Sequence, residues 1–297
     1  MKHQMDTERS VARTMQPEIN LRDFGVALER DCDGIWLAGA KEVVSFPEEG
    51  HATCLQLEDG SFWFRHRNLC IVAAAQRHLT GLIGPIFDVG GGNGFVAQGL
   101  QSAGFEVVLL EPGIHGARNA RRRGLAHVIC GTTEASGLAK GTLPAIGLFD
   151  VVEHIEDDVS FLRSMGNLLV AGGKLMLTVP AYPSLWSSED ISAGHFRRHT
   201  KKSITDALSL AGLELTFVSY FFRPLPIPIF LLRALPFKLG FDRRPDGIKK
   251  AAREHALPTG VISRWLDSAF SEEVQVLTRG DAMRFGASLI AVAQSRA

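Results

Sequence analysis

The sequence lacks the patterns that mark disulfide-rich, zinc-binding or membrane-spanning proteins. Its 297 residues contain only four cysteines, and no two of them form a Cys-x-x-Cys pair. This scatter argues against a disulfide framework or a cysteine zinc site, and it suits a reducing cytoplasm. The N-terminus has no apolar signal core, and no uninterrupted apolar run approaches the roughly 20 residues that span a bilayer. We therefore expect a cytoplasmic protein without a transmembrane segment.

The chain also lacks an excess of charge of either sign. It holds 32 Lys and Arg against 32 Asp and Glu, so its formal net charge is zero. A general nucleic-acid binder needs a basic surface to neutralise phosphates, and we therefore expect no nucleic-acid partner. A hydrophobic content of 45% is ordinary for a globular protein. The length suits one large domain or two small ones.

A glycine-rich turn is the most informative feature that is present. The apolar run 86–89 ends in Gly-Gly-Gly-Asn-Gly, and a helix-like stretch begins at Phe95. Where a strand is followed by a glycine turn and a helix, a ligand can lie against the backbone of the turn and accept hydrogen bonds from the free N–H groups at the start of the helix. Phe95 stands where the dinucleotide pattern G-x-G-x-x-G has its third glycine, which argues against a nicotinamide oxidoreductase. The binding residues predicted from this turn are Asp88, Gly90, Gly92, Asn93 and Gly94.

A second strand ends in an acid at the distance expected of a nucleotide site. The pattern of 105–111 predicts a buried strand, and Glu111 lies 23 positions after Asp88. In βαβ nucleotide sites an acid about 20 residues beyond the turn accepts hydrogen bonds from ribose hydroxyls. Because strand, turn and spacing agree, we expect Glu111 to bind ribose rather than to be a surface glutamate at a strand end.

These motifs resemble those of the class I S-adenosylmethionine (SAM)-dependent methyltransferases. The D-x-G-x-G-x-G turn is similar to the family's first motif, and 149–155 (Phe-Asp-Val-Val-Glu-His-Ile) is similar to its fourth-strand motif. Residues 181–200 resemble a subset with Leu-Trp-Ser, an Asp, and then Gly-His-aromatic-Arg-Arg-aromatic. His199 stands where that subset usually has tyrosine. The resemblance covers about residues 62–222 and the last strand.

The resemblance implies further contacts with the cofactor. An aromatic-aromatic-x-Arg segment covers SAM in many members, which makes Trp63 and Arg65 candidates for covering the cofactor and pairing with its carboxylate. An amphipathic helix that merely packs its rings on the core is the alternative. The loop after the third strand borders the adenine, which places Thr132 there. Asp150 belongs to the loop beneath the transferring methyl group.

Two histidines, His154 and His195, are the candidates for catalysis at the mouth of the methyl pocket. Methyl transfer from a sulfonium depends mainly on alignment, but a hydroxyl acceptor must also lose a proton, and histidine suits that task. Structural histidines are the alternative. The run Asp150-x-x-Glu153-His154 also resembles a metal-binding motif of ubiquinone-pathway and small-RNA methyltransferases, with His195 as a later ligand. Its first acid is the shorter Asp here, so a divalent metal stays an alternative outside the predicted site.

The predicted fold is α/β, with a doubly wound, seven-stranded, mostly parallel sheet of the Rossmann-like methyltransferase type. We expect residues 1–82 to form an N-terminal helical cap and 83–297 to form the SAM-binding core. The last two strands, 213–222 and 285–294, should pair antiparallel although about sixty residues separate them. The intervening stretch, about 223–284, begins apolar and proline-rich, and we expect a lid-like wall of the pocket.

The sequence thus predicts a SAM-dependent methyltransferase, with a hydroxyl of a small or amphipathic metabolite as the acceptor. A non-catalytic SAM-binding protein of the same fold is one alternative. An NAD(P)-dependent oxidoreductase and an RNA methyltransferase are two others, which the glycine spacing and the neutral charge disfavour. A homodimer is left open.

Overall fold

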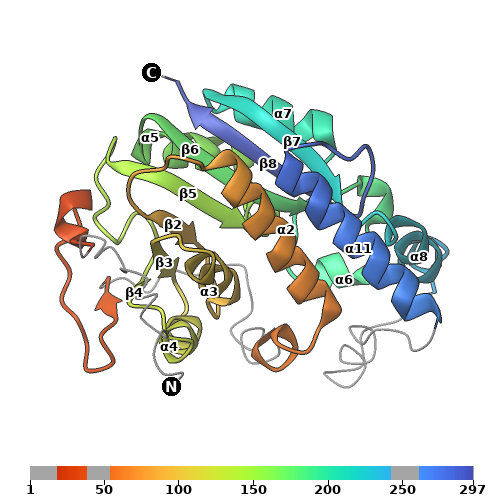
Figure 1. The fold of residues 1–297 in the computed structure, drawn as a ribbon, viewed down its shortest axis with the longest axis horizontal. Helices are drawn as coiled ribbons and strands as arrows, with labels where there is room; N and C mark the ends of the chain where they lie inside the picture. The colour runs from red at the N-terminus through yellow and green to blue at the C-terminus, as the bar shows by residue number, and fades with distance from the viewer. Residues whose placement is uncertain (1–18, 39–53, 242–260, 297) are drawn as a thin grey trace, which may run out of the picture.

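A computed structural model describes residues 19–38, 54–241 and 261–296. They form one eight-stranded sheet with the order β1-β4-β3-β2-β5-β6-β8-β7 (Figure 1). The strands are β1 (Trp36–Leu37), β2 (Ile86–Val89), β3 (Val107–Glu111), β4 (His127–Cys130), β5 (Leu143–Phe149), β6 (Leu169–Pro180), β7 (Leu213–Phe221) and β8 (Ser288–Ser295). Neighbouring strands are parallel except at β8, which runs antiparallel to β6 and β7. The predicted doubly wound, Rossmann-like sheet is confirmed.

Helices cover both faces of the sheet. Successive side chains of a strand point to opposite faces, so apolar residues on both faces need a covering layer. Phe87 packs into a core with residues of α5 and α7, whereas Ile86 packs into a second core with residues of α2, α3 and α11. The helices of the core are α2 (Phe62–His78), α3 (Phe95–Ser102), α4 (Ile114–Arg122), α5 (Asp158–Leu168) and α7 (Lys201–Leu210). The shorter or inserted ones are η1 (Leu21–Phe24), η2 (Val152–His154), η3 (Pro183–Leu185), α6 (Ser188–Ser192), α8 (Pro226–Ile229), η4 (Phe230–Ala234), α9 (Leu235–Lys238) and α11 (Val261–Arg279).

The N-terminal region contributes a strand as well as helices. Strand β1 pairs parallel with β4 at the edge of the sheet and adds an eighth strand to the seven predicted. Its Trp36 is buried and stacks on His127 at 5.6 Å between ring centroids. Two residues are too few to show strand alternation in a sequence, so this strand was not predicted.

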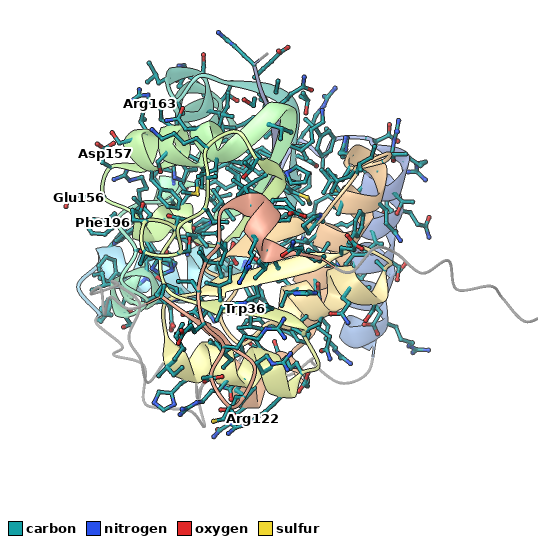
Figure 2. All side chains as sticks on the ribbon, turned by 90° about the vertical axis from the view of Figure 1, so that its left-hand side faces the viewer. Trp36, Arg122, Glu156, Asp157, Arg163 and Phe196 are labelled. Atoms are coloured by element: carbon teal, nitrogen blue, oxygen red, sulfur yellow. The ribbon has the colours of Figure 1, made fainter. Side chains whose placement is uncertain are left out.

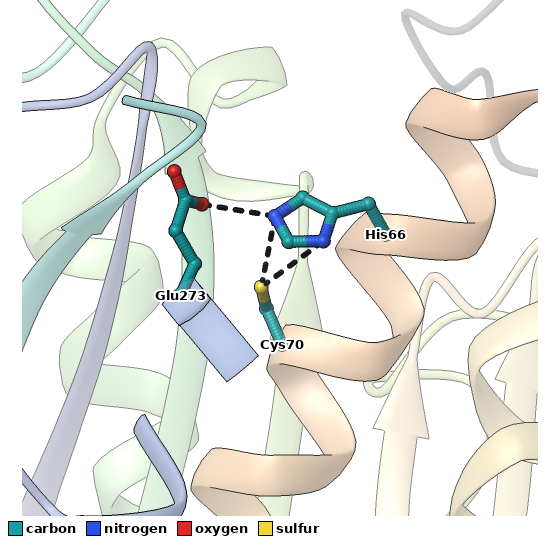
Figure 3. A group of neighbouring side chains, drawn as sticks. All are labelled: His66, Cys70 and Glu273. Carbon is teal, nitrogen blue, oxygen red and sulfur yellow. Dashed lines mark hydrogen bonds and ion pairs between the residues drawn. The ribbon is translucent and has the colours of Figure 1, made fainter. Parts of the chain in front are cut away.

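The insertion between β7 and β8 is held to the core by a buried polar cluster between α11 and α2 (Figure 3). Glu273 has no exposed surface, and its carboxylate accepts the backbone N–H groups of Phe222 at 2.7 Å and Arg223 at 2.6 Å. His66 of α2 lies 2.9 Å from the same carboxylate, and the Cys70 thiol lies 3.4 Å from His66. These contacts join α11, α2 and the end of β7. The cluster therefore serves as a structural anchor.

The described part of this insertion is helical, as α8, η4, α9 and α11. The predicted lid includes 242–260, which lie outside the described residues. Among the helices in the described part of the chain, none is both long and apolar enough to cross a bilayer.

Candidate functional site

The carboxyl ends of β2, β3 and β5 meet at two cavities, where ligands bind in open α/β sheets. The first has a volume of about 740 Å³ and lies against α2, α6 and α8. The second, of about 630 Å³, lies against the loops that follow β3 and β4. Both cavities are lined by Gly90, Gly92, Asp150 and His154, so they meet along the glycine turn. The predicted motifs therefore converge on one edge of the sheet.

The glycines of the turn have different tasks. Gly90, Gly92 and Gly94 all have positive φ, which favours glycine. A Cβ on Gly90 would lie 2.8 Å from Val151, and one on Gly94 would lie 2.7 Å from Leu125. A Cβ on Gly92 would meet nothing within 4 Å. Gly94, also predicted as a binding residue, packs against Ala120 of α4 and lines neither cavity. Gly92 faces open space.

Glu111 lines the second cavity and ties the turn to the end of β3. Its carboxylate accepts the N–H of Gly92 at 2.9 Å and that of Gly113 at 2.7 Å. Burial raises the pKa of Glu111 to about 7, although these two hydrogen bonds act to lower it. Thr132 lines the same cavity, and Phe196, labelled in Figure 2, lines it from the loop after α6. The predicted ribose and adenine residues thus share one cavity.

Asp88 and Asn93 lie beneath the turn and are buried. One carboxylate oxygen of Asp88 has no hydrogen-bond partner among the described residues. Burial raises the pKa of Asp88 to about 7, while Arg67 acts in the opposite direction. The Asn93 amide donates to Glu58 at 3.2 Å and accepts from Asn119 at 3.0 Å. Asn93 therefore stabilises the turn through these hydrogen bonds, and it also lines both cavities.

The raised pKa values predict that stability falls as pH rises. Asp88 and Glu111 ionise near pH 4 in the unfolded chain but near 7 in the folded one, so the folded state binds more protons in between. We expect the free energy of unfolding to decrease from about pH 4 to about pH 7, and Asp88→Asn to flatten that slope. Urea unfolding across this range measures it. Asp281→Asn, at an exposed position, is the control; a slope unchanged in Asp88→Asn would contradict the account.

Helix α2 presents Trp63 and Arg67, not Arg65, to the first cavity. Trp63 stacks on Phe222 with 5.5 Å between ring centroids. Arg67 is buried, with Nε 2.6 Å from the Asp150 carboxylate and a terminal nitrogen donating to the carbonyl of residue 149 at 2.8 Å. Arg65, the arginine predicted from the sequence, is exposed and lines neither cavity. Residues two apart on a helix point about 200° away from each other, so only one of the two arginines can face inward.

Arg67 is the cation among three buried or half-buried acids. Asp150 has a φ of 57° and accepts the Thr178 hydroxyl at 2.8 Å in addition to pairing with Arg67. Glu153 is 1% exposed, and one of its carboxylate oxygens has no hydrogen-bond partner in the described part of the chain. Burial, and then the charge of Asp150, raise its pKa well above the usual range. Asp88 is the third acid. Arg67, which the sequence analysis missed, therefore lowers the cost of burying negative charge here.

Asp190 organises the loop that carries the Gly-His-Phe-Arg-Arg motif. It is 1% exposed, caps α6 through Ser187, and accepts Nε of Arg198 at 2.7 Å. The same carboxylate oxygen lies 3.0 Å from Nδ1 of His195. In its neutral form His195 then donates from Nδ1, which leaves Nε2 to accept a proton. Asp190 was not among the predicted site residues, although the motif included it.

The two predicted histidines lie together at the first cavity. The rings of His154 and His195 are 4.8 Å apart between centroids and nearly perpendicular. Burial, and then the neighbouring His195, lower the pKa of His154 to about 4. His154 is therefore neutral near pH 7, and His195, held by Asp190, is the better placed base.

The alternative metal motif is only partly assembled. Glu153, His154 and His195 each offer one ligand atom, and these atoms lie within 4.8 Å of one another. Asp150, the first acid of the motif, is instead held by Arg67 and Thr178. The described residues therefore do not bring the full set of four ligands together.

Comparison with known proteins agrees with this arrangement. Residues 70–217 match a family model described as a methyltransferase domain. No curated protein matches the sequence. The matched residues are thus similar to a methyltransferase domain, in agreement with the Rossmann-like methyltransferase fold of the sheet.

Solved structures share the fold at low sequence identity. A protein assigned as a methyltransferase from Haloferax volcanii, in complex with the Trm112 methyltransferase activator, aligns with a TM-score of 0.54 and 15% identity, over 86% of this chain and 98% of that one. A phosphoethanolamine N-methyltransferase 2 of Haemonchus contortus, bound to SAM, aligns with a TM-score of 0.53 and 16% identity. That alignment covers 84% of this chain and 58% of the other. At such identities the likeness establishes the fold alone.

Proposed function

We propose that the protein transfers the methyl group of SAM to a hydroxyl of a small or amphipathic metabolite. The observation that carries this proposal is the open space over Gly92, where the two cavities meet along a glycine turn. A cofactor lying across Gly92 would have its ribose at Glu111 and its adenine near Thr132 in the second cavity. Its amino-acid part would enter the first cavity, under Trp63 and near the cation of Arg67.

The chemistry needs alignment and one proton acceptor. SAM, when bound, would supply an activated methyl group whose carbon–sulfur bond breaks as the acceptor oxygen bonds to the methyl carbon, with a neutral thioether as the leaving group. The hydroxyl proton passes to Nε2 of His195, whose Nδ1 is held by Asp190. With its pKa of about 4, His154 is a weak base and would orient the acceptor instead.

The walls of the first cavity suit an acceptor with an apolar portion. Phe62 and Phe64 of α2 line it on one side, and Leu225, Ile229 and Leu232 of the insertion on the other. The glycine turn and the histidines form a polar end of this cavity. An amphipathic metabolite would place its hydroxyl at that polar end.

The test is methyl transfer from labelled SAM by native protein and variants against a panel of hydroxylated amphiphiles. We expect His195→Asn to lower kcat by about 10²- to 10⁴-fold and to abolish the limb of the pH–rate profile that reports the base. S-adenosylhomocysteine should still bind this variant, because the predicted cofactor contacts are intact. His115→Asn, at an exposed position on α4, is the matched control. An unchanged kcat in His195→Asn would contradict the role of base, and transfer only to amines would contradict the hydroxyl acceptor.

A further inference from the structure

The first described stretch of the insertion turns apolar side chains to the outside. Along α8, η4 and α9, the side chains of Ile227 and Leu232 are 70% and 71% exposed, and those of Leu239 and Phe241 just beyond are 62% and 66% exposed. Leu231 is 53% exposed. We call these five residues the insertion face. A helical segment with apolar residues on its solvent side needs a partner surface, because monomers rarely expose such clusters.

The insertion face is continuous with the first cavity. Leu232 belongs to the face and also lines that cavity. Its neighbours Ile229 and Arg233, which are not part of the face, line the cavity too. Glu273 of α11 holds the backbone of Phe222 and Arg223, the residues that lead from β7 into the helices that carry the face. The partner of the face would therefore meet the entrance through which an amphipathic acceptor reaches His195.

The charge of this stretch identifies the chemistry of the partner. The described stretch 223–241 contains Arg223, Arg233 and Lys238, a net charge of +3 in a chain whose net charge is zero. No acidic residue occurs between 223 and 241, where the exposed Lys238 lies beside the face. Apolar side chains flanked by cations are the pattern that binds anionic lipid surfaces. A second copy would bring +3 against +3, which disfavours self-association through this face.

We propose that the insertion face rests on the surface of an anionic lipid bilayer, with the first cavity opening toward the lipid. The acceptor would then be a membrane-resident amphiphile that enters past Leu232. This identification of the acceptor rests on the proposed function, whereas the docking of the face does not. The segment lies on the surface, consistent with the lack of a membrane-crossing helix among the described ones.

The experiment is co-sedimentation of the full chain with vesicles of phosphatidylcholine, alone or in equal mixture with phosphatidylglycerol. We expect the protein to bind the anionic vesicles, and to bind vesicles of phosphatidylcholine alone at least about 10-fold more weakly. Leu231→Gln combined with Phe241→Gln should weaken binding by about 10-fold or more, since both side chains would otherwise be buried in the lipid interface. Neither residue lines a cavity. The matched control combines Leu69→Gln with Ile83→Gln, two exposed apolar residues elsewhere.

Titration with S-adenosylhomocysteine, run on the same samples, separates the two proposals. Native-like titration of the insertion-face variant, together with lost vesicle binding, supports docking and shows that the variant is folded. Docking is overturned if native protein does not bind anionic vesicles, or if the variant binds them as well as native protein does. A concentration-dependent dimer that the variant loses would overturn it too, by assigning the face to a second copy. Vesicle binding without S-adenosylhomocysteine binding would overturn the proposed function and leave docking standing.

Discussion

Gly92→Arg is expected to lower affinity for S-adenosylhomocysteine by at least about 100-fold while the protein stays folded. The side chain would extend from a Cβ position that has no neighbour within 4 Å, at the junction of both cavities. It would therefore occupy the space that the cofactor needs. At a φ of 54° the new residue also costs about 1–2 kcal/mol of backbone strain, which a domain of this size should tolerate. Calorimetric titration and far-ultraviolet circular dichroism measure the two effects.

Gly104→Arg controls for the strain of the Gly92 variant. Gly104 also has a positive φ, of 96°, and a Cβ there would meet nothing within 4 Å, but it is exposed after α3 and lines neither cavity. We expect this variant to bind S-adenosylhomocysteine as native protein does. Equal binding by both variants would mean that the cofactor does not cross the turn.

Arg67→Met should destabilise the protein by roughly 3–5 kcal/mol at pH 8, the usual cost of stripping a buried charge of its partner. Removal of the guanidinium leaves Asp150 without its ion pair. It also removes the cation that favours the ionised form of the buried Asp88, and one of the two, with Arg198, that favour that of Glu153. The loss should be smaller at pH 5, because the acids can then take up protons. Urea unfolding at the two pH values measures the effect.

Arg65→Met is the matched control, since it changes the same residue type on the same helix. Arg65 is exposed, and its loss should change stability by no more than about 0.5 kcal/mol at either pH. Similar destabilisation by the two substitutions would contradict the placement of Arg67 as the buried cation. A larger loss in Arg67→Met at pH 5 than at pH 8 would contradict the role of the acids.

Local patterns in the sequence were enough to predict the sheet apart from β1, and the edge at which the motifs meet. The run 86–89 and the glycines after it predict a strand and a tight turn from their own composition, and the end of β3 at Glu111 follows from a buried run closed by an acid. Parallel strands then bring their carboxyl ends together, as the structure shows for the turn, Glu111 and Asp150.

The remaining features depend on contacts that the sequence does not encode locally. Arg65 and Arg67 stand in the same aromatic run, and only the orientation of α2 on the sheet decides which one is buried. Glu273 is an ordinary helix residue by pattern, yet it binds backbone groups about fifty positions away. Asp190 lies in the recognised motif, but its shared contact with His195 and Arg198 follows from the loop geometry.

A crystal structure of the complex with S-adenosylhomocysteine tests the central claim most directly. The account predicts adenine beside Thr132, ribose hydroxyls at Glu111, and sulfur near Asp150 and His154, with His195 facing the vacated methyl position. A ligand whose adenine lies in the first cavity against α8 and η4, with the second cavity empty, would contradict it.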